Sequence, residues 1–384
     1  MKITSIETFL VDPRWMFVKV STDSGTFGWG EGGLEGYADV TAAAVSALAD
    51  SLIGNDPLRI EDNWQRMTKG GFYRGGPVLS SAVAGIDQAL WDIAGKTLNV
   101  PVYQLLGGHV RDRVRVYGWI GGDSPQDVAT AAAAQRDAGL TAIKMNASAQ
   151  LGHLSSPAES DEIVERATLV RESIGKDLDF AIDFHGRVSG AAARRLLPML
   201  EPLHPLFVEE PVLPGNNHSN LARLIAGSTT PIATGERLYS RWDVLPVLQA
   251  GIAVLQPDLA HAGGISEVRR IAALAETFDV SIAPHCPLGP LALAACLQID
   301  FAIPNFLIQE QSMGIHYNTT AELLDYVVNP EMFDIVDGSI ERPRGPGLGV
   351  IIDEDKVRAS AESSQRLNWR TPVWNHSDGS HAEW

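Results

Sequence analysis

The sequence has few cysteines and no long apolar segment. Cys286 and Cys296 are its two cysteines among 384 residues, and both stand in an apolar stretch, so neither a disulfide framework nor a cysteine metal site is expected. No run of residues approaches the length of a membrane span, and the start, MKITSIETFLVD, lacks the basic and apolar regions of a signal peptide. These absences predict a cytoplasmic protein with two reduced thiols that serve packing.

Positive charge is also scarce. The 30 Lys and Arg residues face 47 Asp and Glu residues, which gives a formal net charge of -17. Nucleic acids and anionic membranes are bound through clustered Lys and Arg side chains, so neither is expected as a partner. A small anionic substrate remains compatible with this charge, because a bound divalent cation can dominate the field inside one pocket.

The sequence does contain the material for two domains. Hydrophobic residues make up 45% and charged residues 20%, as in ordinary soluble globular proteins. Residues 2–31 alternate apolar and polar side chains around a turn signal at Asp23-Ser24-Gly25, which predicts antiparallel strands. Helical spacing follows in three segments, 40–52, 57–69 and 80–98. Strands followed by helices predict a small α+β domain over residues 1–113.

From about residue 114 the pattern changes to short apolar runs that alternate with helix-like stretches. Eight runs follow one another: VRVYGW, TAIKM, DFAID, LFVEE, PIATGE, AVLQPD, VSIAPH and NFLIQE. This alternation predicts a βα barrel over residues 114–330. Because the C-terminal ends of barrel strands meet at one face, the polar residues that end successive runs are expected to converge on one site.

The tail, residues 331–384, returns to Gly, Pro and charged residues. It carries three tryptophans in polar surroundings, Trp369, Trp374 and Trp384. A tryptophan in such a tail usually packs on a neighbouring surface. We therefore expect the tail to fold back on the N-terminal domain or on another subunit.

Carboxylates end three consecutive runs of the expected barrel: Asp183, Glu209 or its neighbour Glu210, and Glu236. A site of high charge with oxygen ligands only favours a hard cation such as magnesium over zinc. The alternative is three unrelated acids that pair with Arg or face solvent, but their place in consecutive units favours the metal. Strand alternation lets only one of Glu209 and Glu210 face the barrel axis, and spacing alone does not choose between them.

Two histidines are candidates for proton transfer. Asp258 and His285 end adjacent runs, an order in which the carboxylate orients the imidazole and leaves its other nitrogen as a general base. His185 lies two residues beyond Asp183, so both side chains face the same way if the strand continues. For each histidine the alternative is a structural role in a loop or on the barrel rim.

Three further polar residues complete the set, Lys144, Asn146 and Glu310. Lys144 can neutralise a substrate carboxylate or be a solvated lysine, and Asn146 occupies the next inward position. Glu310 can donate a hydrogen bond to an enediolate if it keeps its proton, or simply pair with an Arg. Together with a divalent cation these groups suit one chemistry, removal of the weakly acidic proton beside a carboxylate.

These residues resemble the mandelate racemase branch of the enolase superfamily, from the N-terminus to the tail. ALWDIAGK at residues 89–96 is similar to the branch's capping-domain signature, and the barrel strings DFHGR, VEEP, TGER, QPDLAHAGGI, APHCPLGP and QEQSMGIHYN are similar to those of its acid-sugar dehydratases. The resemblance implies an α+β capping domain, completed by the tail, over a (β/α)7β barrel of the TIM type. It also implies one Mg²⁺ per subunit and a homo-oligomer.

The resemblance also implies roles for the strand-end residues. The metal ligands would be Asp183, Glu209 and Glu236, which favours Glu209 over Glu210. The base would be His285 with Asp258, and the acid would be His185. Their positions alone, and not the resemblance, make Lys144 and Glu310 candidates for both catalysis and substrate binding and make Asn146 a candidate for substrate binding.

One departure from the branch limits the reaction. Its racemases carry two lysines around one residue after the second strand, whereas this sequence has Lys144-Met145-Asn146, so a dehydratase is expected instead of a two-base racemase. Because the His–Asp pair of this branch usually serves acids of R configuration at carbon 2, the resemblance implies a small acid sugar of that configuration, galactonate first, with gluconate or an aldopentonate as alternatives. A non-catalytic acid-sugar-binding relic is the other class of function, but such a relic would be expected to have lost one of these residues.

Overall fold

The N-terminal region forms a three-stranded antiparallel sheet covered by helices. The strands are β1 (Ile3–Val11), β2 (Trp15–Thr22) and β3 (Phe27–Glu31). The helices are α1 (Ala38–Ala49), α2 (Ile60–Lys69), α3 (Pro77–Leu98) and α4 (Val102–Leu105). Glycines let β3 lie directly on α3: a Cβ on Gly28 would stand 2.1 Å from the carbonyl oxygen of Ala89. The expected α+β arrangement is present.

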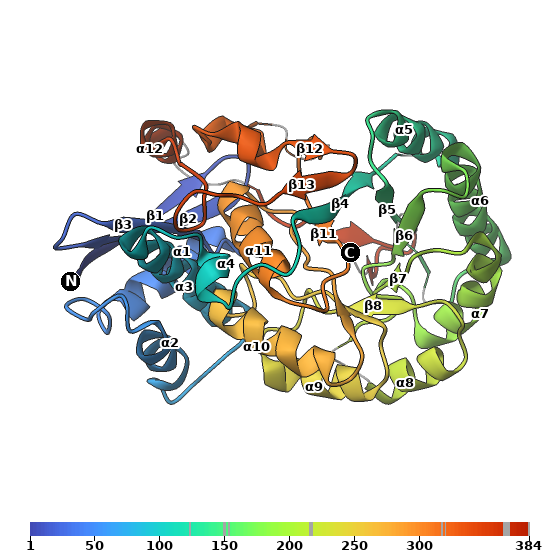
Figure 1. Cartoon of the computed structure of the whole chain (residues 1–384). Coiled ribbons are helices and arrows are strands. Elements are labelled where there is room, and N and C mark those ends of the chain that lie inside the picture. Colours follow the sequence, from blue (N-terminus) through green and yellow to red (C-terminus); the bar gives the residue numbers. More distant parts are fainter. Residues whose placement is uncertain are drawn as a thin grey trace.

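A barrel follows beside this domain (Figure 1). Its parallel strands are β4 (Arg113–Ile120), β5 (Ala142–Asn146), β6 (Asp179–Asp183), β7 (Val208–Glu209), β8 (Ile232–Thr234), β9 (Val254–Leu255), β10 (Ser281–Ile282) and β11 (Gln309–Glu310). Strands β4 to β10 pair in chain order, β11 pairs with β4, and a bridge between Ile282 and Phe306 closes the ring. Each apolar run of the sequence therefore contains a barrel strand.

Helices join successive barrel strands and cover the outside of the ring. They are α5 (Pro125–Asp137), α6 (Pro157–Ile174), α7 (Gly190–Leu200), α8 (His218–Ala226), α9 (Arg241–Gln249), α10 (Gly264–Glu276) and α11 (Pro290–Ala302). The sequence sets some of their starts locally: Ser124 with Asp127 and Ser156 with Glu159 form capping boxes. The alternation confirms the expected (β/α)7β barrel.

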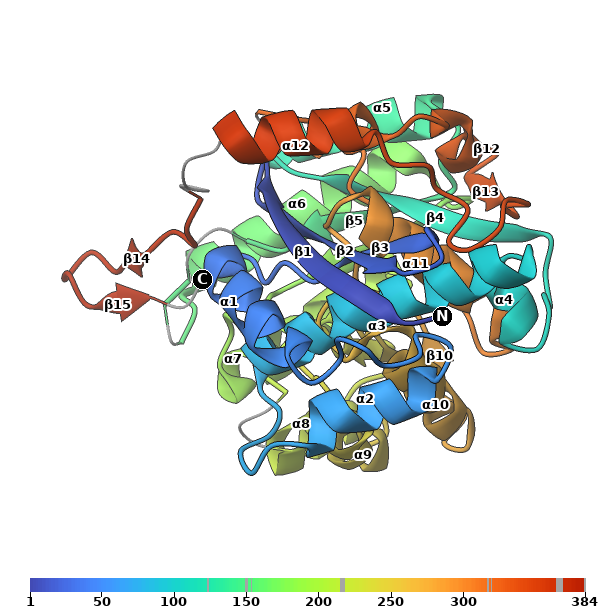
Figure 2. The same ribbon diagram turned by 90° about the vertical axis from the view of Figure 1, so that its left-hand side faces the viewer.

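The tail returns to the capping domain. η2 (Leu323–Tyr326) comes just before the tail, and η3 (Pro330–Phe333) begins at its boundary. The tail then contains β12 (Ile335–Val336), β13 (Ser339–Glu341), which pairs antiparallel with β4 of the barrel, and α12 (Glu354–Ser363). Glu354 pairs with Lys19 at 2.7 Å, and the Tyr326 hydroxyl donates to the Asp12 carbonyl at 2.9 Å. The tail thus completes the capping domain, as expected, and a last hairpin, β14 (Trp374–Asn375) with β15 (His381–Ala382), projects beyond it (Figure 2).

This computed structural model describes residues 1–122, 124–148, 151–152, 154–214, 218–315, 318, 320–363 and 369–382. Trp384, one of the three tail tryptophans, lies outside the described residues. Within the described ranges no helix is long and apolar enough to cross a membrane. The domain limits 1–113, 114–330 and 331–384 stay a prediction.

Candidate active site

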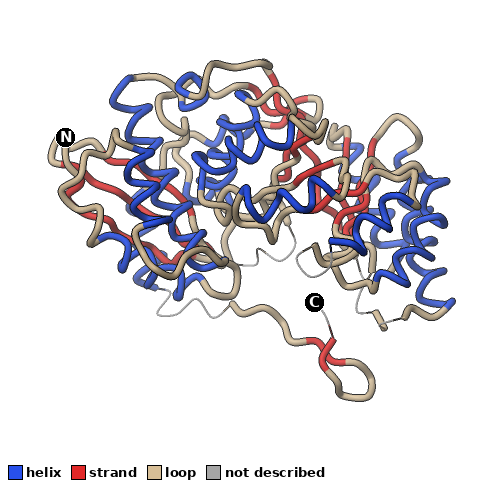
Figure 3. Tube along the Cα trace, turned by 90° about the horizontal axis from the view of Figure 1, so that it is seen from below, coloured by secondary structure: helices blue, strands red, loops and turns tan. Residues whose placement is uncertain are grey.

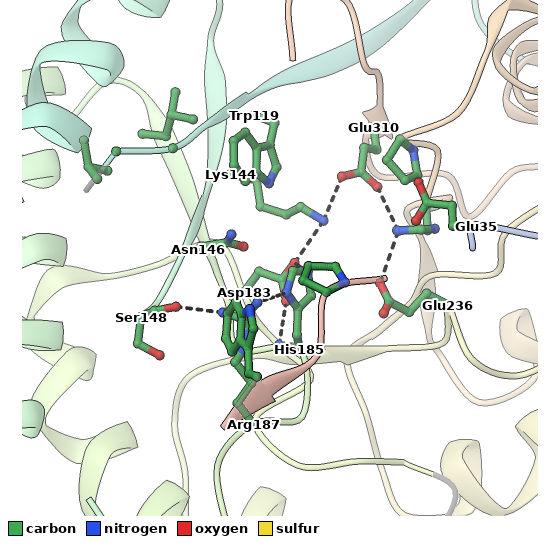
Figure 4. Close-up of a pocket in the computed structure, with 18 of the residues that line it drawn as sticks. Glu35, Trp119, Lys144, Asn146, Ser148, Asp183, His185, Arg187, Glu236 and Glu310 are labelled. Carbon is green, nitrogen blue, oxygen red and sulfur yellow. Dashed lines mark hydrogen bonds and ion pairs between the residues drawn. The ribbon is translucent and has the colours of Figure 1, made fainter. Parts of the chain in front are cut away.

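The strand-end residues meet at one end of the barrel, around a cavity of about 580 Å³ (Figure 4). Seven of the nine predicted side chains line this cavity: Lys144, Asn146, Asp183, His185, Glu236, His285 and Glu310. The other two are buried and contact the lining residues, Glu209 through Lys144 and Asp258 through His285. The convergence expected from the barrel pattern is therefore present.

Lys144 lies among the carboxylates. Its Nζ is 3.0 Å from Glu209 Oε2, 2.9 Å from Glu310 Oε1 and 3.5 Å from Asp183 Oδ2. Burial lowers the pKa of Lys144, but the charges of Glu209 and Glu310 raise it more, so the net pKa is well above its usual range. Lys144 is therefore a buried cation at the centre of the site, not the solvated lysine that the sequence also allowed.

The carboxylates form a donor set made only of oxygen. Among the residues that the structure describes, no three His, Cys, Asp or Glu side chains stand in metal-binding geometry, and Glu236 pairs with Arg237 at 3.2 Å. Burial and the nearby charge of Asp183 raise the pKa of Glu209 to about 8. Buried carboxylates that oppose one another's ionisation, with oxygen as the donor atom, fit a hard divalent cation.

His185 reaches Asp183 through a turn. Strand β6 ends at Asp183, and His185 has a left-handed backbone with φ of 51°, so the strand does not continue to His185, which was the condition for both side chains to face the same way. The turn lets the His185 backbone N–H donate to Asp183 Oδ1 at 2.9 Å and places Nε2 2.8 Å from Oδ2. Burial raises the pKa of Asp183, but His185 and Lys144 lower it further, to below its ordinary value.

Arg187 holds the other edge of the His185 ring. Its Nη2 lies 3.0 Å from His185 Nδ1, and Nη1 donates to the Ser148 carbonyl at 2.7 Å. A guanidinium only donates hydrogen bonds, so Nδ1 is the acceptor and a neutral ring carries its proton on Nε2. The DFHGR string contained this arginine, but spacing gave it no role.

Glu209 and Glu210 are both fully buried, which strand alternation did not predict. Glu210 has φ of 37°, and its Oε2 lies 3.3 Å from Arg237 Nε, whereas Glu209 contacts Lys144. Burial and the charge of Glu236 raise the pKa of Glu210 well above its usual value. The two neighbouring carboxylates therefore pair with different basic side chains, Glu209 with Lys144 and Glu210 with Arg237.

Asp258 and His285 form the expected pair. His285 Nδ1 is 2.8 Å from Asp258 Oδ2, and the two residues bridge their strands in parallel. His285 Nε2 lies 3.2 Å from Glu236 Oε2 and 3.9 Å from Glu310 Oε2. Burial lowers the pKa of His285, but Glu236, Glu310 and Asp258 raise it well above its usual value, which favours the protonated ring in this arrangement.

A third histidine touches this pair, and sequence reasoning missed it. His261 Nε2 is 3.7 Å from Asp258 Oδ2, and its Nδ1 is 3.0 Å from the hydroxyl of Ser81 in helix α3. Its position three residues after Asp258, where the chain turns toward α10, was the signal that could have found it. The contact links the dyad to the capping domain.

Two buried carboxylates of the N-terminal capping domain bind the first turns of α10 and α11. These are the helices that follow Asp258 and His285 in the chain. Glu31 accepts from the backbone N–H groups of Gly289 and Ala292, at 2.8 and 3.0 Å, at the start of α11. Asp87 accepts from the Ser266 backbone N–H at 2.9 Å in the first turn of α10. Burial raises the pKa of Glu31 to about 8 and that of Asp87 to about 7. The capping domain thus fixes the helices just beyond Asp258 and His285.

Both domains match known protein families. Residues 3–107 match the mandelate racemase / muconate lactonizing enzyme N-terminal domain, and residues 127–356 match the enolase C-terminal domain-like family. The chain belongs to the enolase superfamily. The resemblance stated from the sequence is confirmed, and enzymes of this superfamily generally use Mg²⁺.

Relatives of this enolase-superfamily chain match it over its full length. D-galactonate dehydratases from Ralstonia nicotianae and Variovorax paradoxus are 55% and 53% identical over 385 aligned residues, which cover 100% of both chains. A solved enolase from Agrobacterium radiobacter with bound sodium and L-malate has a TM-score of 0.91 and 34% identity, with 100% of both chains covered. A mandelate racemase/muconate lactonizing enzyme-like protein from Roseovarius sp. TM1035 has a TM-score of 0.90 and 30% identity, with 98% of this chain and 99% of the other covered.

Proposed function

We propose that the protein dehydrates D-galactonate to 2-dehydro-3-deoxy-D-galactonate and water. The observation that carries the proposal is the pair of histidines around the carboxylates: His185 Nε2 lies 2.8 Å from Asp183 and His285 Nε2 lies 3.2 Å from Glu236. Such a site offers a base and an acid to one substrate. The full-length similarity to enzymes named D-galactonate dehydratase supports the choice of substrate.

We propose that Asp183, Glu209 and Glu236 hold one Mg²⁺ per subunit. The buried oxygen donor set and its mutual repulsion support this assignment. When bound, the ion would polarise the substrate carboxylate and stabilise negative charge that develops on it.

The first step is removal of the proton on carbon 2. The charges of Glu236 and Glu310 stabilise the protonated ring of His285, so the ring must first lose the proton on Nε2. Nε2 then takes the proton from carbon 2 of the substrate. Asp258 accepts from Nδ1, keeps the ring oriented and stabilises the imidazolium that forms. We propose that the substrate carboxylate binds beside Lys144 Nζ and Glu310, which lie 2.9 Å apart, so that the lysine donates hydrogen bonds to the enediolate.

The second step is loss of the hydroxyl on carbon 3. His185 acts as an acid in its doubly protonated form, for which Arg187 must release Nδ1. It donates the Nε2 proton to the hydroxyl oxygen and is left neutral, the carbon–oxygen bond breaks, and the enediolate electrons form the double bond between carbons 2 and 3. The resulting enol tautomerises to the 2-keto acid, and the hydroxyl leaves as water. The second strand carries Lys144 without a second lysine at Asn146, so no base is present there for racemisation.

A panel of aldonates tests the substrate. D-galactonate should have the highest kcat/KM among hexonates when formation of 2-keto-3-deoxy acid is followed with Mg²⁺ present. A tenfold higher kcat/KM for gluconate or an aldopentonate corresponds to about 1.4 kcal/mol of transition-state preference. That result would change the assigned substrate but would leave the assigned reaction, dehydration, in place. Binding of acid sugars without any keto acid product would instead indicate a non-catalytic binding protein.

We further propose that the protein is a cytoplasmic homo-oligomer. Large aromatic side chains at the surface support the assembly, with exposed fractions of 91% for Phe72, 87% for Tyr73 and 58% for Trp242. The two free cysteines support a reducing compartment.

A further inference from the structure

The tail supplies one wall of the active-site cavity. Trp369, Arg370, Pro372 and Trp374 line the same cavity as Lys144 and His285. This stretch lies beyond residue 356, where the match to the family model ends. The wall therefore does not come from the part of the chain that the enolase C-terminal family describes, and it is a candidate for what distinguishes substrates.

Contacts hold this wall to both domains. On the barrel side, the Arg187 guanidinium stands 4.8 Å from the centre of the Trp374 ring. On the capping-domain side, Arg370 pairs with Asp39 at 3.0 Å, and a Cβ on Gly36 would lie 2.8 Å from the Thr371 hydroxyl. Figure 3 shows the last part of the tail extending away from the rest of the chain and ending in the hairpin of β14 and β15.

The cavity that Trp374 lines also contains buried polar atoms without partners in the described part of the chain. Asn146 Oδ1, Ser148 Oγ and Arg187 Nε are buried and have no hydrogen-bond partner among the residues that the structure describes, and their residues line the cavity. Arg187 itself is only 8% exposed. In Figure 4, Asn146 and Ser148 lie on one side of the cavity, and Glu310 and Glu236 lie on the other. Buried polar groups are rarely left unpaired, so this group points to a ligand that supplies hydroxyls.

We propose that Trp374, Asn146, Ser148 and Arg187 form a subsite for the hydroxylated end of the acid sugar, away from its carboxylate. The proposal rests on the function proposed above, in which carbons 1 to 3 occupy the space around Lys144, His285 and His185. Carbons 4 to 6 must then extend along the cavity. A polyol chain offers C–H faces to an indole ring and hydroxyls to amide, hydroxyl and guanidinium groups, which is the chemistry that this subsite presents.

The test compares substrates of different length. Wild type, Trp374→Ala and Ser148→Ala are assayed with D-galactonate and with a tetronate of the same configuration at carbons 2 and 3. The ratio of kcat/KM for the hexonate to that for the tetronate should fall at least tenfold in Trp374→Ala and by less in Ser148→Ala, mainly through KM. A purely structural role would lower kcat/KM equally for both substrates and leave their ratio unchanged. An unchanged ratio therefore overturns the subsite.

Trp242→Ala is the matched control. Like Trp374, Trp242 lies beside an arginine, with the Arg241 guanidinium 4.5 Å from its ring, but it does not line this cavity. Its substrate ratio should stay that of the wild type.

A binding measurement separates this inference from the proposed reaction. D-galactonate is titrated by calorimetry with Mg²⁺ present into His285→Asn, alone and combined with Trp374→Ala. A dissociation constant at least tenfold weaker in the combined variant supports the subsite even if no aldonate is dehydrated by the wild type, in which case only the proposed reaction fails. An unchanged dissociation constant overturns the subsite, whatever the activity of the wild type.

Discussion

The two sides of the barrel mouth hold their functional groups by different means. On the β6 to β8 side, Asp183, Glu209 and Glu236 lie within the barrel and are balanced by the charges of Lys144 and Arg237. On the β9 and β10 side, the dyad precedes helices whose first turns are capped by Glu31 and Asp87 of the other domain.

The site therefore has two halves. The first, Asp183, Glu209 and Glu236, is held by charge balance, and the second, Asp258 and His285, is held by contacts with the capping domain. Buried like charges are stable only with compensating positive charge, so the first half should respond to cations. The second half depends on hydrogen bonds that cross the domain interface, so it should respond to changes in the capping domain. If the two halves are independent, a change in one half should leave the function of the other unaffected.

The largest effect is expected from the metal. Chelation should abolish dehydration and Mg²⁺ should restore it, with Mn²⁺ as a substitute and Zn²⁺ serving poorly. Glu209→Gln should weaken Mg²⁺ activation by more than the roughly 10–100-fold typical of losing a residue that only supports a ligand, and the adjacent Glu210→Gln should stay within that range. Magnesium titration of activity measures both. Full activity after exhaustive chelation, or a larger effect at Glu210, contradicts the assignment.

A smaller loss, roughly 10²–10⁴-fold, is expected from each histidine, with different consequences for the substrate proton. His285→Asn should stop both dehydration and exchange of the carbon 2 hydrogen with deuterated water, because the base acts first. His185→Asn should stop dehydration and leave exchange measurable by NMR. Magnesium binding serves as the control in both variants, because His185 contacts Asp183. Exchange that persists in His285→Asn would make Lys144 the next candidate base.

The smallest effect is expected at Glu31. Burial raises its pKa from 4.5 to about 8, so between these pH values the folded protein holds a proton that the unfolded chain has released. The contribution of Glu31 to the free energy of unfolding is therefore fully present below about pH 4.5 and decreases as the pH rises to about 8. Glu31→Gln does not titrate, so its melting temperature relative to wild type should improve by about 2 °C or more between pH 6 and pH 9.

Glu172→Gln, at an exposed position of α6, is the control for Glu31→Gln and should show no such trend. Magnesium activation should also be unchanged in Glu31→Gln, because Glu31 contacts the dyad side of the barrel. A loss of Mg²⁺ affinity as large as that of Glu209→Gln would show that the two halves are not independent.

The sequence alone determined the architecture and which side chains meet. Apolar runs spaced by helical stretches are local patterns, and closure of a parallel barrel brings every strand end to one face, so Asp183, Asp258 and His285 could be placed together without coordinates. The confirmed family resemblance rests on the same residues.

Only the tertiary structure decided how those side chains are held. The left-handed turns at His185 and Glu210 depend on local backbone geometry that strand alternation does not contain. The cap that Glu31 places on α11 joins residues 258 positions apart, and the wall at Trp374 lies against the barrel although it follows the barrel's last strand by more than sixty residues. Periodicity reports which face of an element is buried, whereas contacts between distant elements depend on how whole domains pack, and that information is spread over the entire chain.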